Sequence, residues 1–278
     1  MKGGTFKVSS NTSDISSQIV EKAKSLGASL AGIASIDLLK KSPSHYIYSR
    51  IEQNKGVGSR ELAEGINPGE IAWPASAKSA VVIALAHKED ELELDWWENR
   101  VVSAGGRIMA RVVDALAEWV EEKFNLTPCK IPYHVEEGGI FYKDAAVMAG
   151  LGCMGKNNLV VTPEFGPRVR ITTFLLNEEI MPTGPVIFNP CDGCDEPCRK
   201  ICHREAFNGP VYSPIELGMI TLPGRDGWFN RALCNTQMEK DIENAEIRKV
   251  NGNDEPVRFM KYCRHCDLAC PVGKQPVV

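Results

Sequence analysis

Eight cysteines in the last third of the chain constrain its fold more than any other feature of the sequence. They form two compact groups, CDGCDEPCRKIC starting at Cys191 and CRHCDLACP starting at Cys263, with a lone Cys234 between them. Three closely spaced cysteines followed by a fourth that reaches a neighbouring cluster are typical of proteins that hold two [4Fe–4S] clusters. The spacing therefore favours two such clusters, with all eight cysteines as ligands.

The ligands of the two clusters are expected to cross between the groups. Cysteines two or three residues apart can wrap around one cube, whereas the next cysteine lies on a turn that points away and reaches the other cube. One cluster would take Cys191, Cys194, Cys198 and Cys270, and the other would take Cys202, Cys234, Cys263 and Cys266. Structural zinc and disulfides are the alternatives, because CxxC pairs suit tetrahedral zinc as well.

The composition is that of a soluble globular protein, with 43% hydrophobic and 24% charged residues in 278. The net charge of −4 gives little support for RNA binding, which would need a local basic patch. The N-terminus lacks the apolar stretch of a signal peptide, and the longest apolar run, Ala80–Ala86, is too short to span a bilayer. We therefore expect a cytoplasmic protein with reduced cysteines and no membrane contact.

The region before the cysteines mixes helices and strands. Apolar residues at helical spacing predict a helix from Ser13 or Asp14 to Leu26, and a strand is expected over Ser29–Ile36. The continuously apolar segment Lys78–His87 predicts a buried central strand. A long amphipathic helix is expected from about Gly106 to Phe124.

Shorter elements are expected between this helix and the cysteines. They are a strand at Cys129–Tyr133, a helix within Gly138–Met148, and a strand pair formed by Asn158–Val161 and Arg168–Leu176 around the turn PEFGP. Three prolines between residues 182 and 190 predict a domain boundary there. The chain is thereby divided into an α/β core at 1–185 and a cluster domain at 186–278.

The segment AGLGCMGKNNL at Ala149–Leu159 contains a GxGxxG pattern, but it follows a helix and leads into a strand. A dinucleotide site needs the opposite order, so that interpretation is set aside. One remaining interpretation is a loop that binds an anionic group through Gly152, Gly155, Lys156, Asn157 and Asn158. The other is a helix end followed by a tight turn.

The order of these segments resembles the epoxyqueuosine reductase family and, more distantly, the corrinoid-containing reductive dehalogenases. The resemblance runs from about Ile19 to Pro271 and is most specific in AGLGCMGKNNL and the doubled cysteine motif. It implies a nitroreductase-like α/β core followed by a ferredoxin-like domain. It also implies a base-off cobalamin between core and clusters, with the glycine loop and Asn157 near its nucleotide tail. Electrons would then pass from a donor such as ferredoxin or flavodoxin through the clusters to the cobalamin, where a substrate is reduced.

The same resemblance singles out a catalytic carboxylate. Counted back from the glycine loop, Glu136 in HVEEGG matches the family's proton-donating aspartate, with Glu137 as its neighbour. A carboxyl group in a partly apolar pocket can act as a general acid. The tRNA-acting members carry a further C-terminal helical-repeat domain, whereas this chain stops at Val278. A small molecule or a modified nucleoside is therefore the expected substrate, and tRNA is a doubtful partner.

Several other residues have an ordinary structural interpretation beside a functional one. His134, Cys129 and Cys153 suit a buried structural role as well as redox or acid chemistry. Tyr142 and Lys143 could face a substrate cavity, but a solvated helix face is the more ordinary expectation. Two other functions stay open: a protein that reduces or hands on corrinoids, and a ferredoxin-type electron carrier.

Overall fold

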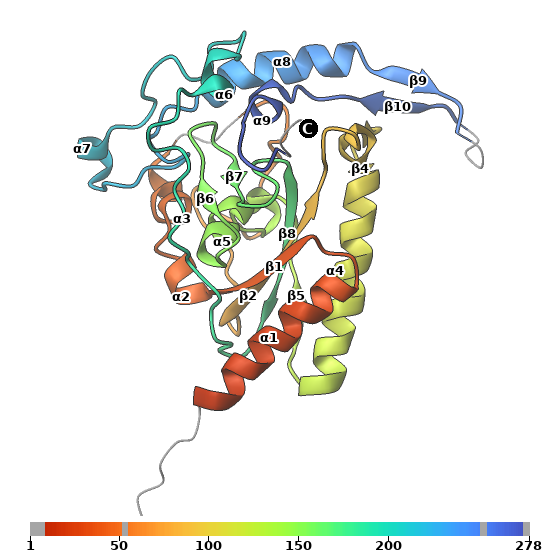
Figure 1. Ribbon diagram of the computed structural model, residues 1–278, viewed down its shortest axis with the longest axis vertical. Helices are drawn as coiled ribbons and strands as arrows, with labels where there is room; N and C mark the ends of the chain where they lie inside the picture. Colours follow the sequence, from red (N-terminus) through yellow and green to blue (C-terminus); the bar gives the residue numbers. More distant parts are fainter. Residues whose placement is uncertain (1–8, 52–54, 251–254, 275–278) are drawn as a thin grey trace, which may run out of the picture.

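The computed structural model describes residues 9–51, 55–250 and 255–274, with side chains from Asp14 onward. Its largest sheet has four antiparallel strands in the order β1-β2-β8-β5 (Figure 1). These strands are β1 (Leu30–Ser35), β2 (Ser79–Ala86), β8 (Val169–Leu176) and β5 (Pro128–Lys130). The mixed α/β class expected from the sequence is confirmed, whereas the ferredoxin-like arrangement of the C-terminal part stays a prediction.

Strand β2 is the centre of the core because helices cover both faces of the sheet. Helices α1 (Ser9–Ser25) and α4 (Ala104–Phe124) lie on one face, where Val81 and Ile83 are fully buried. Helices α2 (Ile36–Leu39) and α5 (Tyr142–Met148) cover the other, against Val82 and Ala84. Figure 1 shows α1 and α4 side by side, away from α5. A strand buried on both faces has no polar side to present, which explains the continuous apolar run.

Most of the expected elements occur close to their expected places, with three differences. The strand expected at Cys129–Tyr133 is β5, which already ends at Lys130. Helix α1 begins at Ser9, earlier than the expected start at Ser13 or Asp14. The predicted pairing of Asn158–Val161 with Arg168–Leu176 is wrong. Strand β7 (Val160–Val161) pairs with β6 (Cys153–Met154) instead, and β8 joins β2 along eight residue pairs. The longer ladder gives β8 more hydrogen bonds than a two-residue partner could.

The C-terminal part is built from short elements. Its helices are α6 (Pro197–Lys200), α7 (Pro214–Leu217), α8 (Arg231–Glu243) and α9 (His265–Leu268), and its strands are β9 (Glu246–Arg248) and β10 (Val257–Met260). Strand β10 pairs with β3 (Trp97–Glu98), which pairs with β4 (Val102–Ser103), so this sheet joins both halves of the chain. The division at residue 185 stays a prediction.

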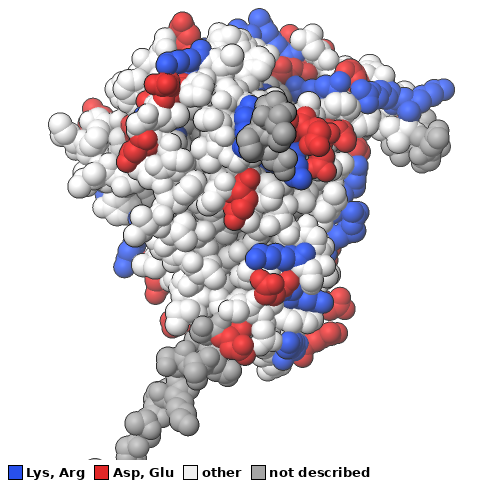
Figure 2. Space-filling view, viewed as in Figure 1, with Lys and Arg blue, Asp and Glu red and all other residues white. Residues whose placement is uncertain are grey.

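The remaining elements are short, and no helix in the described part of the chain could cross a membrane. They are α3 (Pro43–Ile47), η1 (Tyr48–Arg50), η2 (Leu92–Asp95) and η3 (Val135–Glu137). The ribbon formed by β9 and β10 projects at the upper right of Figure 1. Figure 2 shows it lined with basic side chains, and Arg248, Lys249, Arg258 and Lys261 are all exposed there.

Replacing Leu116 with alanine is expected to lower the free energy of unfolding by about 2–5 kcal/mol, because it leaves a cavity in a close-packed core. Leu116 is fully buried between α4 and the sheet. The control is Glu118→Ala on the exposed side of the same helix, which should change stability by less than about 0.5 kcal/mol. Urea unfolding measures both, and equal losses would contradict this assignment of helix faces.

Candidate functional site

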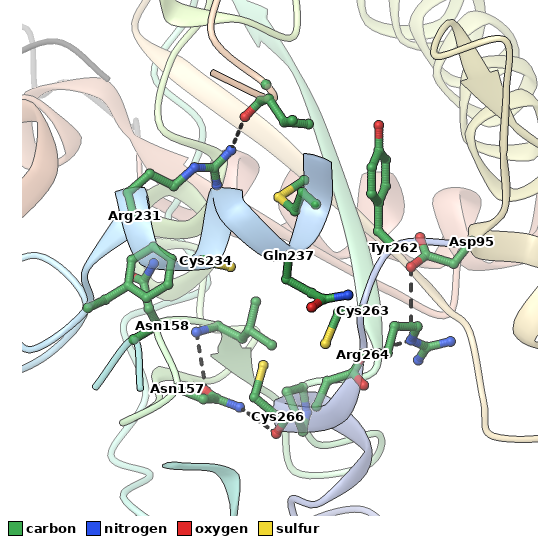
Figure 3. Close-up of a pocket in the computed structure, with 18 of the residues that line it drawn as sticks. Asp95, Asn157, Asn158, Arg231, Cys234, Gln237, Tyr262, Cys263, Arg264 and Cys266 are labelled. Carbon is green, nitrogen blue, oxygen red and sulfur yellow. Dashed lines mark hydrogen bonds and ion pairs between the residues drawn. The ribbon is translucent and has the colours of Figure 1, made fainter. Parts of the chain in front are cut away.

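A cavity of about 500 Å³, the main cavity, lies where α5, β8 and the β6–β7 hairpin meet α8 and the segment before α9 (Figure 3). Its volume is in the range of cofactor and ligand sites. Lining residues come from widely separated parts of the chain, among them Trp97, Tyr142, Val169, Arg231 and Tyr262. A second, much smaller cavity of about 20 Å³ lies beside α6.

Each set of four cysteines that the spacing assigns to one cluster lines one of these two cavities. Cys191, Cys194, Cys198 and Cys270 line the small cavity. Cys202, Cys234, Cys263 and Cys266 line the main cavity. All ten cysteines of the chain lie in described segments and are free thiols. Among the described residues, no three His, Cys, Asp or Glu side chains converge as ligands of a single metal ion.

The crossing of the two cysteine groups follows from the contact between α6 and α9. Cys198 lies in α6 and Cys202 just after it, while Cys266 lies in α9 and Cys270 just beyond. The two short helices pack together, so each group supplies cysteines to both cavities. The role of these thiols as cluster ligands stays a prediction.

The surroundings of the cysteines in both sets of four favour binding of a positively charged metal centre. Burial, and then the neighbouring Cys270 and Cys191, raise the pKa of Cys198 to about 11. Burial also raises the pKa of Cys266, with Asp267 and Cys234 adding to the rise. Thiols in such surroundings ionise only when a cation compensates the charge, and metal binding does this. The donor sets therefore fit iron–sulfur clusters chemically.

The glycine loop is divided between the two cavities. Asn158 lines the main cavity and Asn157 lines both cavities, and the Asn157 side chain donates a hydrogen bond to the Cys266 carbonyl at 3.3 Å. Lys156 lines the small cavity instead and donates to Glu196 at 2.6 Å. Gly152 and Gly155 are lining residues of neither cavity.

The two glycines instead meet the backbone and side chain of the facing strand β7. A Cβ atom at Gly152 would lie 2.1 Å from the Val161 carbonyl oxygen, and one at Gly155 would lie 2.6 Å from the Val161 side chain. Only glycine allows so close an approach. This packing agrees with the tight-turn interpretation of the two glycines, and their predicted role in cofactor binding stays a prediction.

The predicted acid, Glu136, lies in η3 beside the main cavity but does not line it. Tyr133 and His134 of the same loop do line it, whereas Glu136 and Glu137 are not lining residues. The half-buried Glu136 lies near Tyr48, whose pKa is raised first by burial and then by the charge of Glu136. A movement of this loop would be needed to bring Glu136 into the cavity.

Lys143 and Tyr142 line the main cavity, so the expectation of a solvated helix face is wrong for both. The Lys143 ammonium donates to the Asn158 carbonyl at 2.6 Å. Burial, and then the charge of Arg231, lower the pKa of Lys143 to about 8. The sequence raised a cavity-facing position for this pair but could not decide for it, because a seven-residue helix does not reveal from its pattern which face is covered.

A buried polar network fixes the start of α5 and hence the position of Lys143. The Phe141 amide donates to His45 Nε2 at 3.1 Å, so Nδ1 carries the proton and donates to Ser42 Oγ at 2.9 Å. Ser42 Oγ in turn donates to Asp144 at 2.8 Å, and Ser44 donates to the same carboxylate. His45 must stay neutral to accept from Phe141, and burial lowers its pKa to about 3.

No protein family model matches the chain. Two curated relatives are the epoxyqueuosine reductases of Lactococcus garvieae, 25% identical over 273 residues, and of Bacillus subtilis, 24% identical over 275 residues. These alignments cover 91% and 95% of this chain but 69% and 65% of the relatives. The chain therefore spans about two thirds of their length. The tetrachloroethene reductive dehalogenase of Sulfurospirillum multivorans is 43% identical over 60 residues, which are 22% of this chain and 12% of that protein.

Solved structures of the same two kinds of enzyme share the fold. Epoxyqueuosine reductase from Streptococcus thermophilus superposes with a TM-score of 0.54 at 19% identity, covering 94% of this chain and 66% of that one. The Bacillus subtilis enzyme, solved with its catalytic aspartate loop swung out of the active site, gives 0.58 at 19% identity, covering 95% and 66%. A catabolic reductive dehalogenase in complex with 3-bromo-4-hydroxybenzoic acid gives 0.62 at 18% identity, covering 98% and 34%.

The buried His45 predicts a pH-dependent stability. Its pKa is lowered from 6.5 to about 3 in the folded protein, so the unfolded chain binds a proton that the folded chain does not between those values. Stability is therefore lost as the pH falls below 6.5, by up to about 1.4 kcal/mol per pH unit for this one group.

The variant His45→Gln removes this titrating group, so the free energy of unfolding should depend less steeply on pH between pH 6.5 and 5. Urea unfolding at several pH values compares the two proteins, and His87, whose pKa is also lowered to about 3, contributes equally to both. Identical slopes would show that His45 does not stay neutral in the folded chain.

Proposed function

This chain is a relative of the epoxyqueuosine reductases, and from that premise we propose that it is an iron–sulfur oxidoreductase. Electrons would pass through two [4Fe–4S] clusters to a base-off cobalamin in the main cavity, where a substrate is reduced. The observation that carries the proposal is the gathering of the eight cysteines into two sets of four, one of which lines the cavity. A cluster held by the four cysteines of the main cavity would pass its electrons directly to a cofactor bound in that cavity.

Several side chains of the main cavity fit a large polar cofactor. Buried nitrogen and oxygen atoms of His87, Arg264 and Asp267 have no hydrogen-bond partner, and all three residues line the cavity. Buried polar atoms nearly always have a hydrogen-bond partner, so unpaired polar atoms at a cavity wall suit a polar ligand in that cavity. Asn157 and Asn158 add amide groups to the same wall. Cobalamin bound there would supply the low-potential metal centre that reduces the substrate.

Positive side chains beside the cysteines would stabilise the negative charge of the thiolate-bound clusters. Arg231 and Lys143 both lower the pKa of Cys234, against the larger rise caused by burial. Arg168 has the same effect on Cys270 in the other set. Because a cluster gains negative charge when it is reduced, these cations favour the reduced state.

Glu136 is the proposed proton donor, carried into the cavity by movement of its loop. The relative from Bacillus subtilis has been seen with its catalytic loop swung out of the active site, and the absence of Glu136 from the cavity lining suits a comparable state. Tyr133 and His134, on the same loop, already line the cavity. The substrate proposed for this site is a small molecule or a modified nucleoside.

A corrinoid-handling protein is the second candidate, because Glu136 does not line the cavity in this structure. Such a protein needs the clusters and the corrinoid site but no acid. A plain ferredoxin-type carrier accounts less well for a cavity of about 500 Å³ beside the cysteines.

Anaerobic reconstitution with iron and sulfide should give about eight irons per chain, and added cobalamin should show the base-off EPR signal. Cys234→Ala should lose about half of the iron, because one four-iron cluster loses a ligand. The control Cys153→Ala should keep all of it, since Cys153 lies outside both sets. Stoichiometric zinc without corrinoid binding would contradict the proposal.

Glu136→Gln separates the two candidate functions. A reductase should lose substrate turnover while cluster-driven reduction of cobalamin continues, because only the proton is missing. Glu137→Gln is the matched control and should keep turnover. If both variants behave as the unmodified protein does, the acid is not needed and the corrinoid-handling function is supported instead.

A further inference from the structure

A short segment of the chain, residues 55–63, forms part of the wall of the main cavity, and we call it the strap. Gly56 and Gly58 are exposed, whereas Val57 between them is only 6% exposed. Val57 and Gly58 both line the cavity, as does Arg60. The strap therefore separates the cavity from solvent, with the Val57 side chain on its inner side.

Two side chains of α8 hold the strap through its backbone. Arg231 donates to the Val57 carbonyl at 2.5 Å, and the Asn235 amide donates to the Lys55 carbonyl at 2.8 Å (Figure 3 shows the bond from Arg231). Arg231 and Asn235 lie one turn apart on α8, with Cys234 between them. Asn235 is 4% exposed, and burying an amide is costly unless it is hydrogen-bonded. The helix that supplies a predicted cluster ligand thus also holds the strap.

The strap lies so close to α8 that two of its positions have no room for a side chain. A Cβ atom at Gly56 would lie 2.7 Å from the side-chain nitrogen of Asn235, and one at Gly58 would lie 2.8 Å from the Arg231 guanidinium. Both glycines have left-handed φ angles, 104° and 84°. Only glycine combines such angles with so close an approach, so the sequence of the strap suits these two contacts.

The same strap is joined to the loop that carries Glu136. The amide of Ala63 donates to the Glu136 carbonyl at 2.9 Å. Arg60 forms a loose ion pair with Glu137, at 3.9 Å. The strap is therefore bonded to α8 by two of its carbonyls and to the Glu136 loop by an amide and a side chain.

We propose that the strap couples α8 to the Glu136 loop, so that strap and loop move together. While Arg231 and Asn235 hold the strap, the hydrogen bond from Ala63 keeps the backbone of Glu136 outside the cavity lining. Release of the strap opens the wall at Val57 and frees the loop to carry Glu136 inward. The inference rests on the proposed function for the role of Glu136, and it makes Asn235 a positioning residue for that acid.

Hydrogen–deuterium exchange of the iron–sulfur-reconstituted protein, without cobalamin, tests the coupling. Asn235→Ala removes one of the two bonds from α8, so the open state should become more populated. Exchange should become about tenfold faster in peptides covering 55–63 and 134–139, which corresponds to about 1.4 kcal/mol. Exchange in β2 should stay unchanged, because the core does not unfold. The reporting amides, which all donate backbone hydrogen bonds, are those of Ser59, Ala63, Glu137 and Gly139.

Thr236→Ala is the matched control on α8. Thr236 is the exposed neighbour of Asn235, and its hydroxyl donates to the Leu233 carbonyl of its own helix. It lies as near to Cys234 in the helix as the strap contacts do but does not face the strap. Its replacement should leave exchange in both peptides unchanged.

Gly56→Ala tests the same contact from the strap side and leaves α8 unaltered. Its methyl group would displace the Asn235 amide, so exchange should rise in both peptides as it does in Asn235→Ala. Gly65→Ala is the control, because Gly65 also has a left-handed φ angle, of 83°. Among the described residues, no atom lies within 4 Å of its Cβ position. Exchange in 134–139 should therefore stay unchanged in Gly65→Ala.

Faster exchange in only one of the two peptides would overturn the proposal, because strap and loop would then move independently. Unchanged exchange in both Asn235→Ala and Gly56→Ala would also overturn it, because α8 would not be holding the strap. The iron content of each sample is measured alongside. A failure of the proposed function shows separately, as missing iron or a missing base-off signal in the unmodified protein, and the exchange comparison is then made on that protein.

Discussion

One buried arginine ties the C-terminal cysteines to the main sheet, and the candidate site depends on it. Arg168 immediately precedes β8 and is 3% exposed. Its guanidinium donates to the carbonyls of Asp267 and Cys270 at 3.1 Å and to that of Val272 at 2.5 Å. Hydrogen bonds from a charged group in a dry setting are the strong ones, so this cation holds the segment after α9 in place. The turn before it contributes as well, because Gly166 approaches the Val272 carbonyl too closely for any side chain.

From this anchor the rest of the site follows in steps. The anchored segment includes α9, α9 packs against α6, and that contact places the two cysteine groups so that each serves both cavities. The other wall is fixed from within the core, where the His45–Ser42–Asp144 network holds the start of α5. The main cavity is therefore formed by two walls that buried hydrogen bonds hold in place, and the loop carrying Glu136 lies at its side.

Local patterns in the sequence were sufficient to predict the core elements and to group the cysteines. The apolar run of β2 and the amphipathic pattern of α4 each depend on neighbouring residues, and both elements occur where they were expected. The pairing of β8 could not be predicted in this way, because its partner β2 lies more than eighty residues earlier. The same limit applies to the site. Lys143, Arg60 and Arg100 line one cavity from three separate segments, whereas Glu136, matched by its position along the chain, is not among the lining residues.

The central claim is that two crossed sets of four cysteines hold two iron–sulfur cubes, one of them against the main cavity. Anomalous diffraction at the iron edge from anaerobically grown crystals tests it most directly. The account predicts two four-iron sites, one bonded to Cys191, Cys194, Cys198 and Cys270 and the other to the four cysteines at the main cavity. Single metal ions bound by neighbouring CxxC pairs, or one four-iron site whose ligands all come from one group, would contradict it.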